Sequence, residues 1–141
     1  MKSNHVILLF FLVCTLSSYS DAALKRKGIT FFKGSWEEAL IKAKEENKYV
    51  FIDFYKTWCG PCKKLKRTSF KDPEVGAYFN KNFINISIDA ESKEGIKIAR
   101  RYSVSAYPTL VITDHTGKQK TRSVGFKKPY ILSNFVRRIV P

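Results

Sequence analysis

The sequence predicts an α/β protein in which a central mixed β-sheet is flanked by helices on both faces. From residue 35 to residue 139, segments with strand-type composition alternate with segments whose apolar residues recur at helical spacing. The order is a helix, strand, helix, helix, strand and helix, followed by a hairpin and a last helix. Strands that are joined through helices are expected to be parallel, and the hairpin should add antiparallel edges.

The first half of the domain contains a short apolar group, a helix and a buried strand. Residues 29–32 are apolar enough for an edge strand. The sequence S-W-E-E from Ser35 to Glu38 is a capping box, which predicts a helix that continues to about residue 47. Residues 49–55 are rich in aromatic and β-branched side chains and predict a buried strand, although that strand contains an acid, Asp53. Good helix formers follow at 63–67.

The second half begins with another helix, because Asp72 precedes a proline that suits the first helical position. The helix expected after Cys59 therefore ends near Ser69. Gly95 weakens one of the later helices. The remaining predicted elements are a strand at 83–89, a helix at 92–102, a strand at 108–113, a turn at 115–118, a hairpin strand at 119–124 and an amphipathic helix at 128–139.

The motif W-C-G-P-C-K at 58–63 places two thiols three residues apart, between a strand and a helix. A thiol at a helix N-terminus lies at the positive end of the helix dipole, which favours the thiolate. The thiolate is the nucleophile of disulfide exchange, and a second thiol at this spacing can resolve a mixed disulfide. Cys59 and Cys62 are therefore predicted to form a redox-active dithiol.

Three other uses of a C-x-x-C pair lead to different expectations. A structural zinc site needs about four ligands. Beyond this pair only Cys14 and His115 are candidates, because His5 lies in a segment that resembles a leader, so we expect no metal. Covalent haem would need a histidine after Cys62, where Lys63 stands, so no cofactor is expected. A purely structural disulfide stays open, although its loop is too short to remove much chain entropy.

Residues 1–22 resemble a secretory signal peptide, which leaves residues 23–141 as one domain. Lys2 supplies a positive charge, residues 6–16 form an apolar run, and small residues follow, so cleavage could occur after Ser20, Ala22 or Ala23. The apolar run is shorter than the ~20 residues that span a bilayer. Cys14 could be a lipidated cysteine, although Val13 before it is unusual for that role.

The chain carries a net charge of +14, and its lysines are spread along the sequence. Such a charge is compatible with acidic client proteins, with an anionic membrane surface or simply with a solvated basic surface. Export argues against a nucleic-acid partner. Charge alone assigns no function here.

From residue 35 to residue 139 the sequence closely resembles the thioredoxin superfamily. Four features carry this resemblance: the motif at 58–63, Asp53 six residues before Cys59, the Tyr107-Pro108-Thr109 stretch, and Gly125. The resemblance implies a thioredoxin fold and a thiol–disulfide oxidoreductase that acts on disulfides of client proteins.

The resemblance also implies a role for each site residue. Cys59 is similar to the family's exposed attacking thiol, Cys62 to its resolving thiol, and Asp53 to the buried acid that moves the proton of Cys62. Burial should raise the pKa of Asp53; the alternative is a core carboxylate with local hydrogen bonds. Pro108 resembles the family's cis-proline, after a residue whose backbone pairs with a client. The expected client-binding residues are Trp58, Gly60, Pro61, Tyr107, Pro108 and Gly125. A trans Pro108 and a merely packed Trp58 are the alternatives.

Two departures from ordinary thioredoxins are visible. Asn85 stands where those proteins have a lysine near the buried acid, and Arg67 replaces a helix-kinking proline. The pattern from Lys63 to Val75 instead resembles exported proteins related to the terminal domain of DsbD-type thiol:disulfide interchange proteins. This likeness implies export, to the periplasm or as a secreted protein, and a membrane-bound electron donor. Gly60-Pro61 between the cysteines resembles the reducing members of the family, so a reductase is expected, and we expect it to be a monomer. An oxidase or isomerase, or a non-catalytic client-binding module, remains the alternative.

Overall fold

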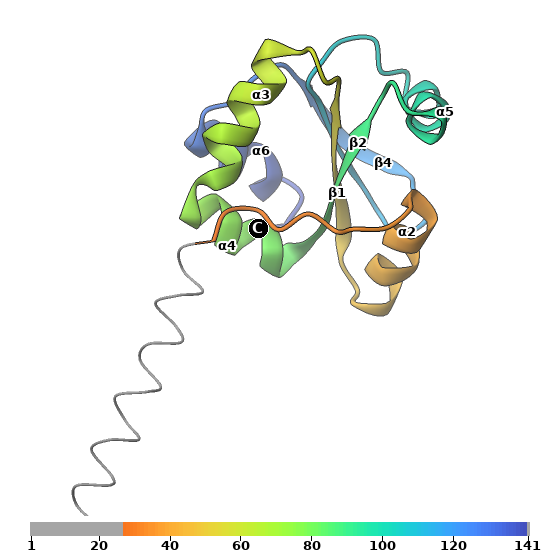
Figure 1. Cartoon of the computed structure of the whole chain (residues 1–141). Helices are drawn as coiled ribbons and strands as arrows, with labels where there is room; N and C mark the ends of the chain where they lie inside the picture. The colour runs from red at the N-terminus through yellow and green to blue at the C-terminus, as the bar shows by residue number, and fades with distance from the viewer. Residues whose placement is uncertain (1–26, 141) are drawn as a thin grey trace, which may run out of the picture.

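The computed structural model describes residues 27–140, which form a four-stranded sheet with helices on both faces (Figure 1). The strand order is β2-β1-β3-β4, with β1 at Tyr49–Tyr55, β2 at Phe83–Asp89, β3 at Thr109–Thr113 and β4 at Gln119–Val124. β1 and β2 are parallel, whereas β1 with β3 and β3 with β4 are antiparallel. The predicted mixed sheet is confirmed, but only β4 is an antiparallel edge because β3 lies inside the sheet.

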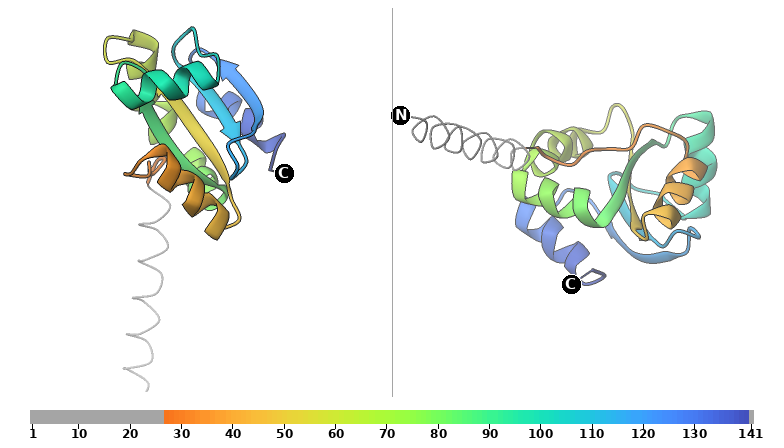
Figure 2. Two further views of the ribbon diagram at one scale, coloured as in Figure 1. Left: turned by 90° about the vertical axis from the view of Figure 1, so that its right-hand side faces the viewer. Right: turned by 90° about the horizontal axis from the view of Figure 1, so that it is seen from below.

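Helices cover the two faces of this sheet in separate groups (Figures 1 and 2). One group consists of α2 (Trp36–Glu45) and α5 (Lys93–Arg101). The other consists of α3 (Gly60–Arg67), a short 3₁₀ helix (Ser69–Lys71), α4 (Pro73–Asn82) and α6 (Pro129–Arg137). None of the helices between residues 27 and 140 has the length and apolarity that a membrane span requires.

Alternation along β1 decides which face each side chain meets. Val50, Ile52 and Phe54 are buried in the cluster with α2 and α5. Phe51 is buried in the opposite cluster, together with Leu65 of α3. Successive side chains of a strand point to opposite faces, so Asp53 shares the face of Phe51 and lies on the side of α3.

The expected edge strand at 29–32 is wrong, because this segment forms no strand ladder with the sheet. The Ile29 N–H donates to the carbonyl of Phe70, and the Phe32 N–H donates to the carbonyl of Asn85, each at 2.7 Å. Since the two bonds reach different elements, they do not form a ladder. The apolar side chains that suggested a strand pack instead against the two cores.

The predicted helix starts after Ser35 and Asp72 are confirmed, whereas α2 ends at Glu45 rather than near residue 47 and α6 ends at Arg137 rather than at 139. The Ser35 side chain accepts from the N–H of Glu38, whose carboxylate accepts in turn from the N–H of Ser35, as a capping box requires. α3 ends at Arg67, and Asp72 caps α4 by accepting from the N–H groups of Glu74 and Val75. The interruption between helices α3 and α4 therefore lies where the Asp72-Pro73 pair predicted it.

Replacing Gly95 by alanine should destabilise the fold, although alanine is the better helix former. A Cβ at this position would lie 1.8 Å from the carbonyl oxygen of Asp89. Forced overpacking of this kind typically costs about 1–3 kcal/mol. Urea unfolding should show this loss for Gly95→Ala and almost none for the control Gly60→Ala, whose Cβ meets nothing within 4 Å. Equal stability of both variants would contradict the packing account.

Candidate active site at the N-terminus of α3

The two cysteines lie where β1 leads into α3, and they form a disulfide with a Cα–Cα distance of 5.3 Å. Cys59 is the N-cap residue of α3, and Cys62 lies in its first turn. Pro61 fits the start of the helix, where its missing N–H has no partner to lose. Between residues 27 and 140, no group of three or more His, Cys, Asp or Glu side chains could hold a metal ion.

Hydrogen bonding at the helix start distinguishes the two sulfur atoms. The Sγ of Cys59 accepts from the backbone N–H of Cys62 at 3.2 Å. A thiolate on Cys59 would keep this donor and would also lie at the positive end of the helix dipole. The site therefore favours Cys59 as the attacking thiolate.

The expected difference in exposure between the thiols is not seen in the disulfide form. Cys59 is 4% exposed and Cys62 is 2% exposed. Lys63 is exposed at the end of the motif, and the disulfide is flanked by Trp58, which is 66% exposed, and by the exposed Gly60 and Pro61. A client therefore meets these three flanking residues before it meets sulfur.

Asp53 is a buried carboxylate on β1, on the side of the sheet that α3 covers, and only 1% of it is exposed. The Ser87 hydroxyl donates to its Oδ2 at 2.9 Å, while its Oδ1 has no hydrogen-bond partner among the described residues. Burial raises the pKa of Asp53 to about 6, against the opposing effects of Ser87 and Lys66. Such a group can accept a proton near neutral pH. Among the described residues, Ser87 alone hydrogen-bonds to this side chain, so local protein hydrogen bonds reach only one of its two oxygens.

The residue in place of the family's lysine, Asn85, is turned away from this acid. Its side-chain amide donates to the carbonyl of Thr30 and to Oδ1 of Asn80, each at 3.3 Å. The cation that acts on Asp53 comes instead from α3: Lys66 is half-buried, with its Nζ 3.1 Å from the ring centroid of Tyr55.

The sequence prediction missed Lys66. The spacing from Cys62 could have indicated this lysine. Lys66 lies one helical turn after Cys62 and therefore shares the face of α3 that faces Asp53.

The predicted client-binding loops lie near the dithiol at one end of the sheet, where β1 ends and β3 begins. Thr109 pairs with Phe54 near the end of β1, and Val124 pairs with Thr109. The N–H of Gly125 donates to the carbonyl of Pro108 at 2.7 Å, and Gly125 has a φ of +83°, which favours glycine. The Tyr107–Pro108 bond is cis, so the trans alternative is wrong.

Trp58 is held by a carboxylate that the sequence prediction did not include. Its indole N–H donates to Glu91 at 2.9 Å. The backbone N–H and hydroxyl of Thr57 donate to the other oxygen of Glu91 at 3.3 and 3.2 Å. These bonds, that from Trp58 above all, lower the pKa of Glu91. Trp58 is thus fixed at its polar end and exposed along its ring, which does not fit the alternative of simple packing.

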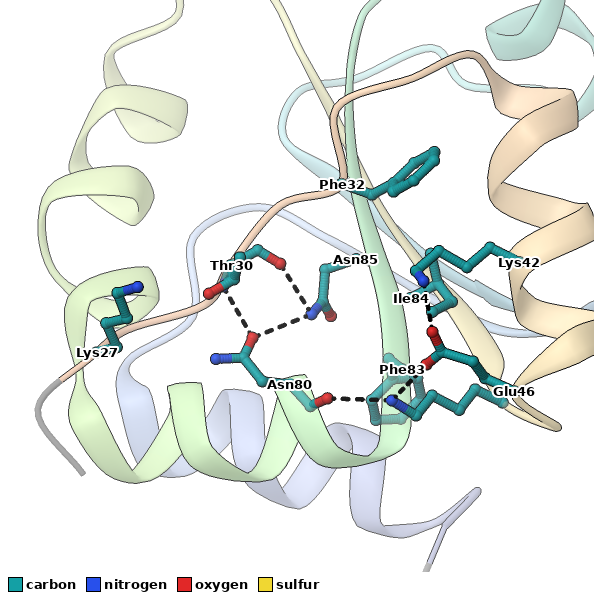
Figure 3. A pocket seen from close by; sticks show the side chains of 10 residues that line it. Lys27, Thr30, Phe32, Lys42, Glu46, Asn80, Phe83, Ile84 and Asn85 are labelled. Atoms are coloured by element: carbon teal, nitrogen blue, oxygen red, sulfur yellow. Dashed lines mark hydrogen bonds and ion pairs between the residues drawn. The ribbon is translucent and has the colours of Figure 1, made fainter. Parts of the chain in front are cut away.

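A pocket of about 420 Å³ lies at the opposite end of the sheet, where β2 begins (Figure 3). Its apolar wall includes Phe32, Phe83 and Ile84. Its polar side chains bond mainly to one another. Lys42 and Lys48 both pair with Glu46, and Figure 3 shows the Asn85 amide between Thr30 and Asn80. Since the pocket contains neither cysteine nor Asp53, it takes no part in the site described above.

Comparison with known proteins places this arrangement in a family. A family model described as a thioredoxin-like domain matches residues 36–139. Thioredoxin H2-2 of Oryza sativa is 38% identical over 67% of this chain and 66% of its own length. Protein DsbD of Haemophilus influenzae, a thiol:disulfide interchange protein, is 27% identical over 73% of this chain and 19% of its own length. The chain spans 64–66% of the length of the rice and Arabidopsis H2 thioredoxins that it matches.

A solved structure from Bacteroides thetaiotaomicron, described as a candidate disulphide-isomerase, superposes with a TM-score of 0.71. It is 40% identical to this chain, and the match covers 81% of this chain and 95% of that one. Together with the family model, this likeness confirms the expected thioredoxin fold. The chain belongs to the thioredoxin-like domain family.

Proposed function

We propose that this chain is an exported thiol–disulfide oxidoreductase that reduces disulfides of client proteins. The observation that carries the proposal is the position of Cys59 Sγ at the N-cap of α3, where the N–H of Cys62 donates to it, on the side of the sheet where Asp53 is buried. Likeness to thioredoxins and to DsbD supports the same chemistry.

The reaction proceeds in two exchange steps. The Cys59 thiolate attacks one sulfur of a client disulfide, which forms a mixed disulfide and releases the other client sulfur as a thiolate. Cys62 gives its proton to the Asp53 carboxylate and attacks the Cys59 sulfur, which releases the second client thiolate. The client gains two electrons, and the protein ends as the Cys59–Cys62 disulfide.

The reducing direction is supported by the residues between the cysteines and by the relatives. Gly60-Pro61 resembles the reducing members of the family, and the plant relatives are named as thioredoxins. A reductase outside the cytosol needs a supply of electrons, and the likeness to DsbD favours a membrane-bound donor. We propose a monomer as the working form.

Export rests on residues 1–22, which lie outside the described residues. Removal of this segment would leave Cys59 and Cys62 as the only cysteines, which suits a working couple in an oxidising compartment. The periplasm is the compartment we propose, with secretion as the alternative. Mass spectrometry of the protein from the periplasmic fraction should show cleavage after Ser20, Ala22 or Ala23. Recovery of the intact chain in the cytosol would contradict export.

A second candidate function is disulfide isomerisation, which the description of the Bacteroides structure favours, or oxidation by the same dithiol. The reduction potential of the Cys59–Cys62 couple separates the two, and the indole of Trp58 beside the disulfide provides a fluorescence readout. A value near the ~−270 mV of thioredoxin supports the reductase. A value between about −120 and −180 mV would instead assign an oxidase or isomerase.

A further inference from the structure

Lysines surround the dithiol on the surface that a client must approach. We define the basic rim as Lys56, Lys63, Lys64 and Lys127. Its members come from three segments at the same end of the sheet. These are the loop after β1, the first turns of α3, and the loop after β4.

Lys56 lies between two of the expected client-binding side chains. Its Nζ is 5.2 Å from the ring centroid of Trp58 and 4.9 Å from that of Tyr107. Both distances are within the range of cation–π attraction. The charge of Lys56 thus lies beside Trp58 and beside Tyr107, the residue before Pro108.

The other members place positive charge beside Gly125 and in the first turns of α3. Lys127 donates to the carbonyls of Val124 at 2.7 Å and Gly125 at 3.4 Å, and Lys64 places its Nζ 4.7 Å from the ring centroid of Phe126. Lys63 is exposed and lies one helical turn after Cys59, on the same face of α3.

Acidic side chains do not neutralise this rim. The salt bridges of residues 27–140 join Lys42 and Lys48 to Glu46, and Lys120 to Asp114, so none includes a rim lysine. Asp53 is buried. Glu91, which is held by Trp58 and Thr57, is near Lys56 and offsets part of its charge, so one carboxylate stands against four lysines and the rim stays positive.

We propose that the basic rim selects clients whose cysteines are flanked by aspartate or glutamate. The proposal rests on the proposed function and names its substrate class. Complementary charge around a site raises the rate of encounter by about 10- to 1,000-fold at low ionic strength, and it penalises partners of like charge. Because Lys56 and Lys127 lie beside expected client-binding residues rather than on a distant surface, their charges act on the residues next to the client disulfide.

The test compares three peptides that contain the same disulfide, flanked by aspartates, by serines or by lysines. The second-order rate constant with the reduced protein should be at least about tenfold higher for the acidic than for the basic peptide at low salt. The ratio should approach one at high salt, where charges are screened over about 3 Å. The oxidised protein is also mixed with the dithiol forms of the three peptides. A preference for acidic flanking residues is then measurable whichever direction the exchange takes.

Variants locate the effect in the rim. Lys56→Gln/Lys127→Gln should lower the ratio of acidic to serine peptide at least about threefold, whereas Lys56→Arg/Lys127→Arg should keep it. The control Lys44→Gln/Lys81→Gln removes the same net charge from exposed lysines near the opposite end of the sheet, and it should leave all three rates unchanged.

A ratio of acidic to basic peptide near one in the native protein would overturn the proposed preference. Equal losses in the rim and control variants would also overturn it, because net charge rather than the rim would then be responsible. If the rim variants lose binding to vesicles of anionic lipid while the peptide ratio does not change, the rim serves a membrane surface and the proposal fails. Absence of disulfide reduction, with exchange running only from the dithiol peptides, would contradict the reductase alone.

Discussion

Replacing Cys59 by serine should abolish turnover of client disulfides, with a loss of about a thousandfold or more. A serine hydroxyl cannot replace the thiolate that the N–H of Cys62 and the helix dipole favour at this position. The measurement is the steady-state reduction of a peptide disulfide with an excess of a small dithiol as electron source, corrected for the uncatalysed rate.

Lys44→Ser is the control, because it replaces an exposed residue of α2, away from the dithiol, and leaves both cysteines in place. It should keep the larger part of the activity. If Cys59→Ser kept activity comparable to this control, the dithiol would not be the site of the chemistry, and the binding-module alternative would be favoured.

Replacing Asp53 by asparagine should stabilise the protein at neutral pH. The pKa of this acid is raised from 3.8 to about 6 in the fold. Below about pH 4 it is protonated in both states, and between about pH 4 and pH 6 only the unfolded state ionises, so stability decreases as the pH rises. Above pH 6 the loss is constant. The rise of the Asp53 pKa from 3.8 to about 6 corresponds to about 3 kcal/mol of stability, which the asparagine variant should recover.

Urea unfolding of the oxidised protein at about pH 8 and pH 4 measures this effect. Asp53→Asn should be more stable than the native protein at the higher pH and should be close to it at the lower one. Ser87→Ala is a useful comparison, since it removes the hydroxyl that donates to Asp53 and keeps the acid. An asparagine variant with the pH dependence of the native protein would show that Asp53 does not carry the pKa shift.

The same substitution should slow the second exchange step. Asparagine cannot accept the proton of Cys62, so the mixed disulfide should accumulate about tenfold or more. For the native protein, the rate of this step should decrease as the pH falls through about 6, the pKa of Asp53, because a protonated acid cannot accept a proton. The asparagine variant should lack this decrease.

The elements and residues that sequence reasoning placed correctly are those with local chemical reasons. The Ser35 capping box, the Asp72 cap and the cysteine pair depend on side chains a few residues apart, which a pattern can express. The segment at 29–32 failed because a short apolar run does not show whether a partner strand is available.

Parts of the site depend on contacts between elements and were therefore missed. Glu91 follows β2 and hydrogen-bonds to Trp58, which follows the neighbouring strand β1. Lys66 comes near Asp53 only when α3 packs on β1. The low exposure of Cys59 likewise depends on how the surrounding elements pack around the disulfide. None of these follows from spacing along the chain alone, except that Lys66 shares a helical face with Cys62.

The assignment of Cys59 as the attacking sulfur and Cys62 as the resolving sulfur is tested most directly by trapping the intermediate. The reduced Cys62→Ser variant is mixed with a peptide disulfide, quenched with an alkylating reagent, digested and analysed by mass spectrometry. We predict a mixed disulfide between Cys59 and one half of the peptide, and none with Cys59→Ser. No adduct on Cys59, or an equal adduct on Cys62 of the Cys59→Ser variant, would contradict this assignment.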